Sequence, residues 1–335
     1  MKAVRLHPSP DGEPAYSPSN PAPASALHLD TVAAPKPSAP GELLVQVKAS
    51  TIIRDTLTWP ETYTREYTTP GNDLAGVVIE VYDKESKVQV GDEVFGMLAA
   101  DRPGSWAEHA IVLEEEVAPK PASLSWDEAA ALPLSGMTAF EALFVHAGVK
   151  VPRPEEALHN FGIGRAGTHN EERKKVLVTG AAGAVGLHVT AATSSNPRNE
   201  KFLHGLGADG VTEYTSLHAP SYRDAYDIVI DTVGGQPLAS AWNCVKAGGT
   251  LVSVDSSSFN FVEEHRRQGV ARGGIRALFF IVEGGRQSLD ALARFAEAGI
   301  LKIFVLDVYP LEEVREAYEK ASGRSSGRGK IVLSI

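Results

Sequence analysis

A glycine-punctuated stretch at residues 176–188, VLVTGAAGAVGLH, constrains the fold of this chain more than any other segment. The β-forming run at 176–179 ends at Gly180, and two further glycines follow at intervals of three residues. Such a pattern is typical of a strand that turns sharply into a helix whose free N–H groups hold a phosphate. It predicts that a dinucleotide is bound by the turn residues Gly180, Ala181, Gly183, Ala184, Val185 and Gly186.

The segments after this turn predict the sheet to which it belongs. Four runs are continuously apolar rather than alternating: KKVLVTG, DIVIDTV, GGTLVSV and IRALFFIV. Strands of this kind are buried on both faces, as in a parallel sheet covered by helices. Residues 1–125 differ, because their short apolar runs are interrupted by glycine, proline and charge, which is typical of an antiparallel, barrel-like domain. Between the two, Ser125 and Glu128 form a capping box that starts a helix.

Composition narrows the class of protein. The 335 residues suffice for about two domains, and the net charge of −10 argues against nucleic acid or anionic membrane as a partner. The sequence has no run of 18 apolar residues, so we expect no membrane-spanning helix. Cys244 is the only cysteine, which excludes an intrachain disulfide and a four-cysteine zinc site. A reducing, cytoplasmic location fits best.

The choice of cofactor depends on the residues after the second strand of the sheet. A site that prefers NAD usually has an acidic residue there to hold the ribose hydroxyls. The segment TAATSSNPRNEKF has no acid before Glu200, whereas it offers hydroxyl and cationic groups that suit a 2′-phosphate. The residues in question are Ser194, Ser195, Arg198 and Lys201, and they predict NADP(H). The alternative is a solvated polar turn without a ligand.

The spacing between the turn and this polar segment is unusually short. Only seven residues, LHVTAAT, separate Gly186 from Ser194, whereas a parallel crossover usually takes about a dozen. If 189–193 form the second strand, no crossover helix fits; if 184–193 form the helix, little remains for the strand. We favour the helix, with a short or absent second strand. In one alternative the crossover is remodelled, and residues 151–174 fill the space left by the lost helix. In the other, the chain is a splice or gene-model variant that binds its cofactor badly.

A series of motifs along the whole chain resembles the medium-chain dehydrogenases/reductases, and most closely their zinc-independent quinone oxidoreductase-like and enoyl reductase-like branch, including fungal members. The motifs occur in the family's order: PGNDLAGVV, VGDEVFGM, GSWAEHAIV, AALPLSGMTAFEAL, VLVTGAAGAVG, FLHGLGADGV, YDIVIDTVGG, GGTLVSV and GRGKIVL. The resemblance implies a GroES-like β-barrel domain formed by residues 1–124 and 283–335. A Rossmann-type, doubly wound α/β domain at 125–282 is inserted between them, with a shortened first crossover and a loop insertion at 151–174.

The resemblance also implies functional residues. On the cofactor side they are Tyr214, Val233, Gly234, Phe279, Phe280 and Lys330, although Lys330 could instead be a charged residue at a strand edge. In the substrate cleft, the residues expected to act are Tyr63, Asp55 and Asn72. Tyr63 could donate a proton, and Asp55 could instead pair with Arg54. A homodimer is also possible, as in relatives.

The positions that correspond to the family's catalytic zinc ligands are Ile52, Asn72 and Ser135. An aliphatic side chain cannot bind zinc, and a neutral amide or hydroxyl is a poor ligand, so we expect no metal. Without a Lewis acid, the substrate must itself accept hydride readily, as quinones and α,β-unsaturated (enoyl) carbonyls do. The expected function is NADPH-dependent reduction of such a small molecule, with secondary metabolism as the expected context. The alternative is a non-catalytic accessory protein that kept the fold and binds cofactor weakly.

Overall fold

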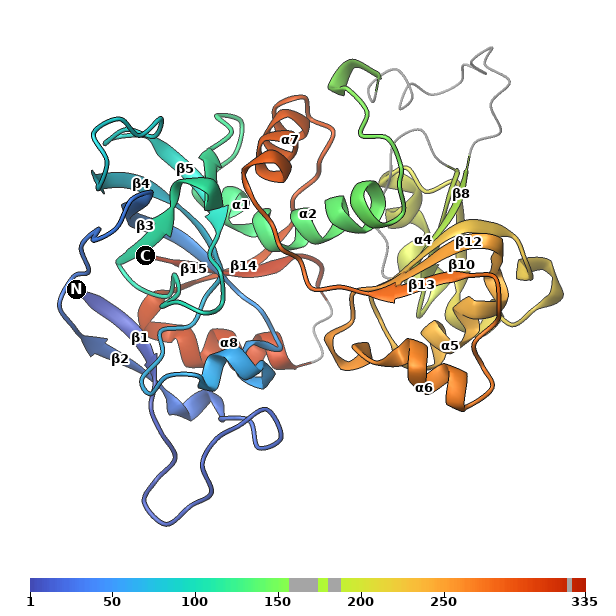
Figure 1. The fold of residues 1–335 in the computed structure, drawn as a ribbon, viewed down its shortest axis with the longest axis horizontal. Coiled ribbons are helices and arrows are strands. Elements are labelled where there is room, and N and C mark those ends of the chain that lie inside the picture. Colours follow the sequence, from blue (N-terminus) through green and yellow to red (C-terminus); the bar gives the residue numbers. More distant parts are fainter. Residues whose placement is uncertain (157–173, 180–187, 324–326) are drawn as a thin grey trace. The chain divides into compact units, whose positions relative to one another are not determined.

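The structure, a computed structural model, describes residues 1–156, 174–179, 188–323 and 327–335 (Figure 1). The chain divides into two compact units, one made of Met1–Met137 with Gly284–Ile335, and the other of Thr138–Glu283. The first boundary lies 13 residues after the expected one, because helix α1 (Trp126–Ala131) packs against strands of the first unit. Most of the expected loop insertion, residues 157–173, lies outside the described residues.

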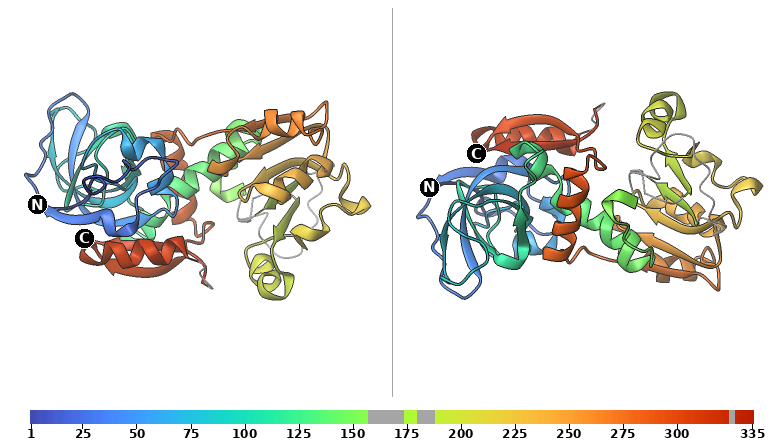
Figure 2. Two further views of the ribbon diagram at one scale, coloured as in Figure 1. Left: turned by 90° about the horizontal axis from the view of Figure 1, so that it is seen from below. Right: turned by 90° about the horizontal axis from the view of Figure 1, so that it is seen from above.

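The first unit is built on a seven-stranded sheet to which both ends of the chain contribute (Figure 2). Its last strand, β15 (Lys330–Ser334), lies inside the sheet, parallel to β14 and antiparallel to β3. A separate antiparallel pair joins β1 (Lys2–Leu6) to β2 (Leu27–Thr31). The remaining strands are β3 (Glu42–Ile52), β4 (Asp73–Val81), β5 (Glu93–Met97), β6 (His109–Leu113), β7 (Val117–Pro119) and β14 (Val305–Pro310).

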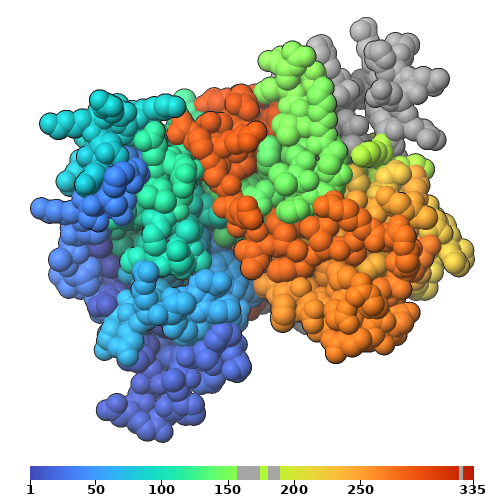
Figure 3. Space-filling view, viewed as in Figure 1, coloured from blue at the N-terminus to red at the C-terminus, as the bar shows by residue number. Residues whose placement is uncertain are grey.

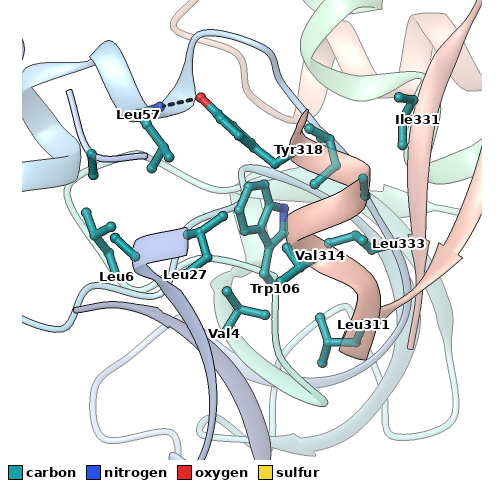
Figure 4. Close-up of a cluster of buried hydrophobic side chains, with 14 residues drawn as sticks. Val4, Leu6, Leu27, Leu57, Trp106, Leu311, Val314, Tyr318, Ile331 and Leu333 are labelled. Carbon is teal, nitrogen blue, oxygen red and sulfur yellow. Dashed lines mark hydrogen bonds between the residues drawn. The ribbon is translucent and has the colours of Figure 1, made fainter. Parts of the chain in front are cut away.

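Buried side chains from both chain ends form one core cluster in this unit (Figure 4). Trp106 is fully buried at its centre, and its indole N–H donates to the carbonyl of Thr51 at 3.0 Å. The hydroxyl of Tyr318 accepts from the N–H of Leu57 at 3.3 Å and donates to the carbonyl of Arg54 at 2.7 Å. The cluster therefore ties the N-terminal strands to helix α8 (Val314–Ser322).

Helix α1 begins where the sequence predicts, although the single helix expected to continue from it is divided into α1 and α2 (Pro133–Phe140). The Ser125 capping box is confirmed: its hydroxyl accepts from the N–H of Glu128, whose carboxylate accepts from the N–H of Ser125. The C-terminal segment alternates helix and strand as expected, with α7 at Arg286–Glu297 before β14, and α8 before β15.

The second unit contains a six-stranded sheet in which all neighbouring strands are parallel. The strand order is β10-β9-β8-β11-β12-β13, so the chain starts in the middle, builds outward to one edge and then to the other. This is the 3-2-1-4-5-6 order of a doubly wound Rossmann sheet, which confirms the predicted fold class. The strands are β8 (Lys175–Thr179), β9 (His188–Thr193), β10 (Gly210–Glu213), β11 (Tyr226–Asp231), β12 (Val245–Ser253) and β13 (Arg276–Phe279).

Helices cover both faces of this sheet. On one face, α5 (Gly235–Cys244) and α6 (Phe261–Arg267) pack on β11 and its neighbours. The orange segment that contains α6 and β13 forms much of the visible surface of this unit (Figure 3). On the other face lie α4 (Asn196–Gly205) and a π-helix (Glu141–His146) that continues α2 (Pro133–Phe140). No helix among the described residues is long and apolar enough to span a bilayer.

The second strand of this sheet contradicts the expected helix over residues 184–193. Residues 188–193 form β9, which pairs along its length with β8 on one side and β10 on the other. The β-branched Val189, Thr190 and Thr193 favour a strand, and Ala191 and Ala192 are buried on its opposite faces. A helix here would have left the edges of β8 and β10 unpaired. Eight residues, 180–187, therefore connect β8 to β9.

Candidate functional site

The order of strands in the second unit identifies one edge of the sheet as the candidate site. Strands β8 and β11 are neighbours, but the chain leaves them toward opposite edges of the sheet. In open parallel sheets, ligands bind outside the carboxyl ends of the strands at such a switch point. The candidate site is therefore the carboxyl edge, formed by the residues that end these strands or directly follow them.

Asp231, the last residue of β11, organises this edge. It is fully buried, and its Oδ1 accepts from the hydroxyl of Thr179 at 2.8 Å. Its Oδ2 accepts from the N–H of Gly234 at 2.9 Å and from the hydroxyl of Ser253 at 3.1 Å. Burial raises the pKa of Asp231, although these hydrogen bonds act in the opposite direction. One carboxylate thus holds the ends of β8, β11 and β12 together.

Thr232 adds a second link between the neighbouring strands β8 and β11. Its N–H donates to the hydroxyl of Thr179 at 3.0 Å, and its own hydroxyl donates to the carbonyl of Thr179 at 2.7 Å. The last residue of β8 is therefore bonded to the side chains of both Asp231 and Thr232. The glycine turn that follows, with Gly180, Ala181, Gly183, Ala184, Val185 and Gly186, lies outside the described residues.

The turn from β11 into α5 requires glycine at position 234. Gly234 has a φ of +71°, and a Cβ atom there would lie 2.3 Å from Oδ2 of Asp255. The same Asp255 oxygen accepts from the hydroxyl of Ser258 at 2.7 Å. The preceding Val233 keeps 40% of its surface exposed at the carboxyl edge. Gly234 itself is buried and its N–H is bonded to Asp231, so of the two residues predicted to contact the cofactor only Val233 is exposed at this edge.

The residues predicted to hold the 2′-phosphate lie where β9 passes into α4. Ser194 directly follows the strand, Ser195 is the N-cap residue of α4, and Arg198 and Lys201 are exposed on the helix. Neither serine hydroxyl bonds to a residue that the structure describes, and Ser195 makes no side-chain cap. Two hydroxyl groups are therefore available to a ligand at this end of the edge.

Three further groups lie close to the same end of the sheet. Tyr214 begins a short helix directly after β10, and is half-buried. The carboxylate of Glu213, the last residue of β10, accepts from the N–H of Asn196 at 2.8 Å. Oδ1 of Asn196 is buried and has no hydrogen-bond partner among the described residues. An acceptor left without a donor at this position fits a ribose hydroxyl of a dinucleotide.

Phe279 and Phe280 lie at the other end of the carboxyl edge, where β13 ends. Phe279 packs with the cluster under α5 and α6, and Phe280 with the cluster on the opposite face. The ring centroid of Phe280 lies 4.1 Å from that of His146. Both phenylalanines are half-buried: packing within the unit covers part of each side chain, and the rest is exposed. The structure thus brings the adenosine-side and nicotinamide-side candidates to one edge of one sheet, which fits an extended dinucleotide.

The proposed catalytic candidates lie in the first unit, and the first of them, Tyr63, is held by the backbone. Its hydroxyl donates to the carbonyl of Leu57 and accepts from the N–H of Ala22 at 3.0 Å. Burial raises the pKa of Tyr63. Because the hydroxyl proton is already engaged, this geometry favours a structural role over the proton donation that the sequence suggests.

Asp55 and Asn72 are likewise engaged. The carboxylate of Asp55 pairs with the guanidinium of Arg54, with 3.0 Å between Oδ1 and Nε, as the alternative interpretation had it. The buried Asn72 donates from its side-chain Nδ2 to the backbone carbonyl of Leu98 at 3.2 Å. The backbone carbonyl of Asn72 in turn accepts from the N–H of Leu98. Asn72 therefore fastens the start of β4 to the end of β5.

Asp73, a buried polar residue of the first unit with several hydrogen bonds, is not among the residues that the sequence singles out. It is fully buried, and its Oδ2 accepts from the hydroxyl of Thr51 and from Nζ of Lys330, each at 2.6 Å. Oδ1 accepts from the N–H of Leu134 at 2.7 Å. Lys330, expected to reach a phosphate, is therefore committed to a buried ion pair. An acidic residue at the start of an otherwise apolar strand was the signal available in the sequence.

The positions considered for zinc do not form a metal site in the described structure. Ile52 belongs to the buried core cluster of the first unit, and Ser135 is exposed on α2. Across the described residues, no group of three or more His, Cys, Asp or Glu side chains could hold a metal ion.

Comparisons with known proteins agree with this architecture. Residues 39–122 match the family described as alcohol dehydrogenase GroES-like domain, and residues 206–333 match the family described as zinc-binding dehydrogenase. The first match confirms the GroES-like domain that the resemblance implies. A quinone oxidoreductase structure from Coxiella burnetii has a TM-score of 0.77 at 24% identity, over 100% of this chain and 99% of that chain.

Two relatives match nearly the whole chain. A probable zinc-binding oxidoreductase, mitochondrial, from Arthroderma benhamiae is 33% identical over 93% of this chain and 94% of its own length. A quinone-oxidoreductase homolog, chloroplastic, from Spinacia oleracea is 32% identical over 92% and 94%. The chain therefore belongs to the medium-chain dehydrogenase/reductase superfamily, in its quinone oxidoreductase-like branch.

Proposed function

We propose that this chain reduces quinones or α,β-unsaturated carbonyl compounds with NADPH, without a catalytic zinc. The observation that carries the proposal is the carboxyl edge of the second unit, where two serine hydroxyls, the exposed Val233 and two half-buried phenylalanine rings lie at the ends of the strands. When bound, the nicotinamide supplies a hydride. The residues of the chain bind and orient the dinucleotide: Ser194, Ser195 and Arg198 at the 2′-phosphate, and Val233, Gly234 and Phe279 nearer the nicotinamide.

The absence of a Lewis acid in this proposal restricts the substrate. A simple ketone needs an electrophile on its oxygen, whereas a quinone or enone spreads the arriving charge through conjugation. The residues at the zinc-ligand positions support a zinc-free site. Ile52 lies in an apolar core, and the amide nitrogen of Asn72 is bonded to the carbonyl of Leu98. The description of one matched family and the name of one relative refer to zinc, so this part of the proposal needs its own test.

Cofactor titration followed by turnover assays tests the proposal. We expect NADPH fluorescence to report saturable binding, and NADPH oxidation to follow addition of an ortho-quinone or an enone. Turnover should continue in EDTA, whereas loss of activity with EDTA and recovery with zinc would contradict the zinc-free site. The relative rates with the quinone and the enone separate the two substrate classes.

One observation favours a second candidate, a non-catalytic accessory protein. Because β9 takes residues 188–193, only eight residues connect β8 to β9, fewer than a helical crossover needs. A crossover of about a dozen residues usually contains the helix that presents its N-terminus to the diphosphate. Absence of binding at millimolar NADPH would favour this candidate over the enzyme.

Two finer expectations accompany the proposal. A homodimer would sediment at about twice the 35.7 kDa mass of the chain, which analytical ultracentrifugation measures directly. A cytoplasmic location is testable by fractionation, and the names of the two relatives place those proteins in a mitochondrion and a chloroplast.

A further inference from the structure

Glu213 places a negative charge at the end of the site where the 2′-phosphate is expected. It ends β10, the strand next to β9, and its Oε1 lies 2.8 Å from the N–H of Asn196 in the first turn of α4. Among the described residues, no lysine or arginine forms an ion pair with Glu213. The carboxylate is therefore compensated by a helix N-terminus and not by a cation.

The groups around this carboxylate include both hydrogen-bond donors and hydrogen-bond acceptors. Ser194 and Ser195 can donate hydrogen bonds to a phosphate, and Arg198 adds positive charge on the same helix. Glu213 and the unpartnered Oδ1 of Asn196 are acceptors, which suit a hydroxyl donor. One end of the carboxyl edge thus combines groups that suit a 2′-phosphate with groups that suit a free 2′-hydroxyl.

We propose that Glu213 is a specificity-determining residue which weakens the preference for NADPH and lets the chain bind NADH as well. This inference rests on the proposed dinucleotide site. The dianionic 2′-phosphate is repelled by the carboxylate, whereas a ribose hydroxyl is not. A single charge about 6 Å from a dianion in a water-like medium changes affinity about tenfold.

The plain alternative is that Glu213 only caps α4. Ser195 occupies the N-cap position without making a side-chain bond, so Glu213 performs that task from the neighbouring strand. A cap affects the binding of both dinucleotides equally, because it acts on the helix and not on the phosphate. The ratio of the two dissociation constants therefore separates a specificity role from a capping role.

Glu213→Gln is the test variant, because a glutamine carbonyl can still accept from the N–H of Asn196 while the charge is lost. We expect the Kd for NADPH to fall about tenfold and the Kd for NADH to stay within about twofold. Binding is measured by fluorescence titration at fixed low salt, since added salt screens the effect. If E213Q does not fold, E213S, which removes the same charge, is measured in its place.

Asp209→Asn is the matched control. The carboxylate of Asp209 accepts from the N–H of Val189 at 2.7 Å, so it makes the same kind of bond at the amino end of the same strand. It should leave the ratio of the two dissociation constants unchanged. An unchanged ratio in E213Q, with both cofactors bound by wild type, would overturn the inference alone. Wild type that binds neither dinucleotide would overturn the proposed function and the inference together.

Discussion

Each unit contains one fully buried aspartate, and the two are neutralised differently. Asp73 in the first unit pairs with the ammonium of Lys330, 257 residues away. Asp231 in the second unit has hydroxyl and backbone N–H donors and forms no ion pair with the described residues. The comparison indicates that a counterion joins distant segments of the first unit, whereas neutral donors position the turns at the carboxyl edge of the second.

This difference has an energetic basis. A buried ion pair is costly to break from one side, because the remaining charge has neither solvent nor partner. A carboxylate held by several neutral donors keeps the others when a substitution removes one of them, so each such substitution has a smaller effect on the free energy of unfolding.

Lys330→Met should have the largest effect. Removing the ammonium leaves Asp73 charged and buried, and we expect the free energy of unfolding of the first unit to fall by about 3–5 kcal/mol. Urea unfolding followed by tryptophan fluorescence measures this, since three of the four tryptophans, at 59, 106 and 126, lie in that unit. The double variant D73N/K330M should recover part of the loss. A change below 1 kcal/mol in K330M would show that the pair contributes little.

Asp231→Ala should destabilise the second unit by about 2–3 kcal/mol, because Gly234 N–H loses its acceptor and two hydroxyls must find new ones. The single thiol, Cys244, reports on this unit: it is buried, and burial raises its pKa to about 11, so it reacts slowly in the folded state. Thiol labelling across a urea gradient gives the stability. Labelling that matches wild type would contradict the role assigned to Asp231.

Gly234→Ala should cost about 1–2 kcal/mol through its positive φ, and more through the collision with Asp255. Gly235→Ala is the matched control, since Gly235 also has a positive φ, +54°, but has nothing within 4 Å of an added Cβ. The difference between the two variants isolates the collision. We expect weaker NADPH binding for G234A only, and equal binding by both variants would count against a close approach of ligand at residue 234.

The smallest effect concerns pH. Because burial raises the pKa of Asp231, the carboxyl group of Asp231 stays protonated in the folded state at a pH where it is already ionised in the unfolded chain. The stabilisation is complete below the ordinary pKa of about 4 and is lost as pH rises through the folded value. Asp231→Asn removes this dependence. We expect the stability of D231N relative to wild type to increase across that window, as thermal unfolding between pH 3 and pH 7 would show.

The sequence predicts most of the fold and one half of the candidate site. Continuous apolar runs correctly place β8, β11, β12 and β13, because strands buried on both faces need no alternation. The motifs that end these strands, DTVGG and ALFFIV, lie on the carboxyl edge as expected. The sequence is less informative at HVTAAT, where six residues are too few to separate a helical from a strand period.

Contacts between distant parts of the chain explain the remaining errors. The hydroxyl of Tyr63 is engaged by Ala22, 41 residues earlier, and the ion pair of Lys330 joins it to Asp73. A pattern within a single segment holds no information about such partners. The family resemblance implies a proton donor and a phosphate ligand at these positions, whereas the packing gives both side chains a role in holding the first unit together.

The interior position of β15 has a consequence for synthesis on the ribosome. The first unit needs residues 330–334 between β14 and β3 before its sheet is complete, although its other large segment ends at Met137. The parallel sheet of the second unit has all its strands by Phe279. All strands of the inserted unit are therefore synthesised before β15, and the sheet of the first unit can be completed only after residues 330–334 have been made.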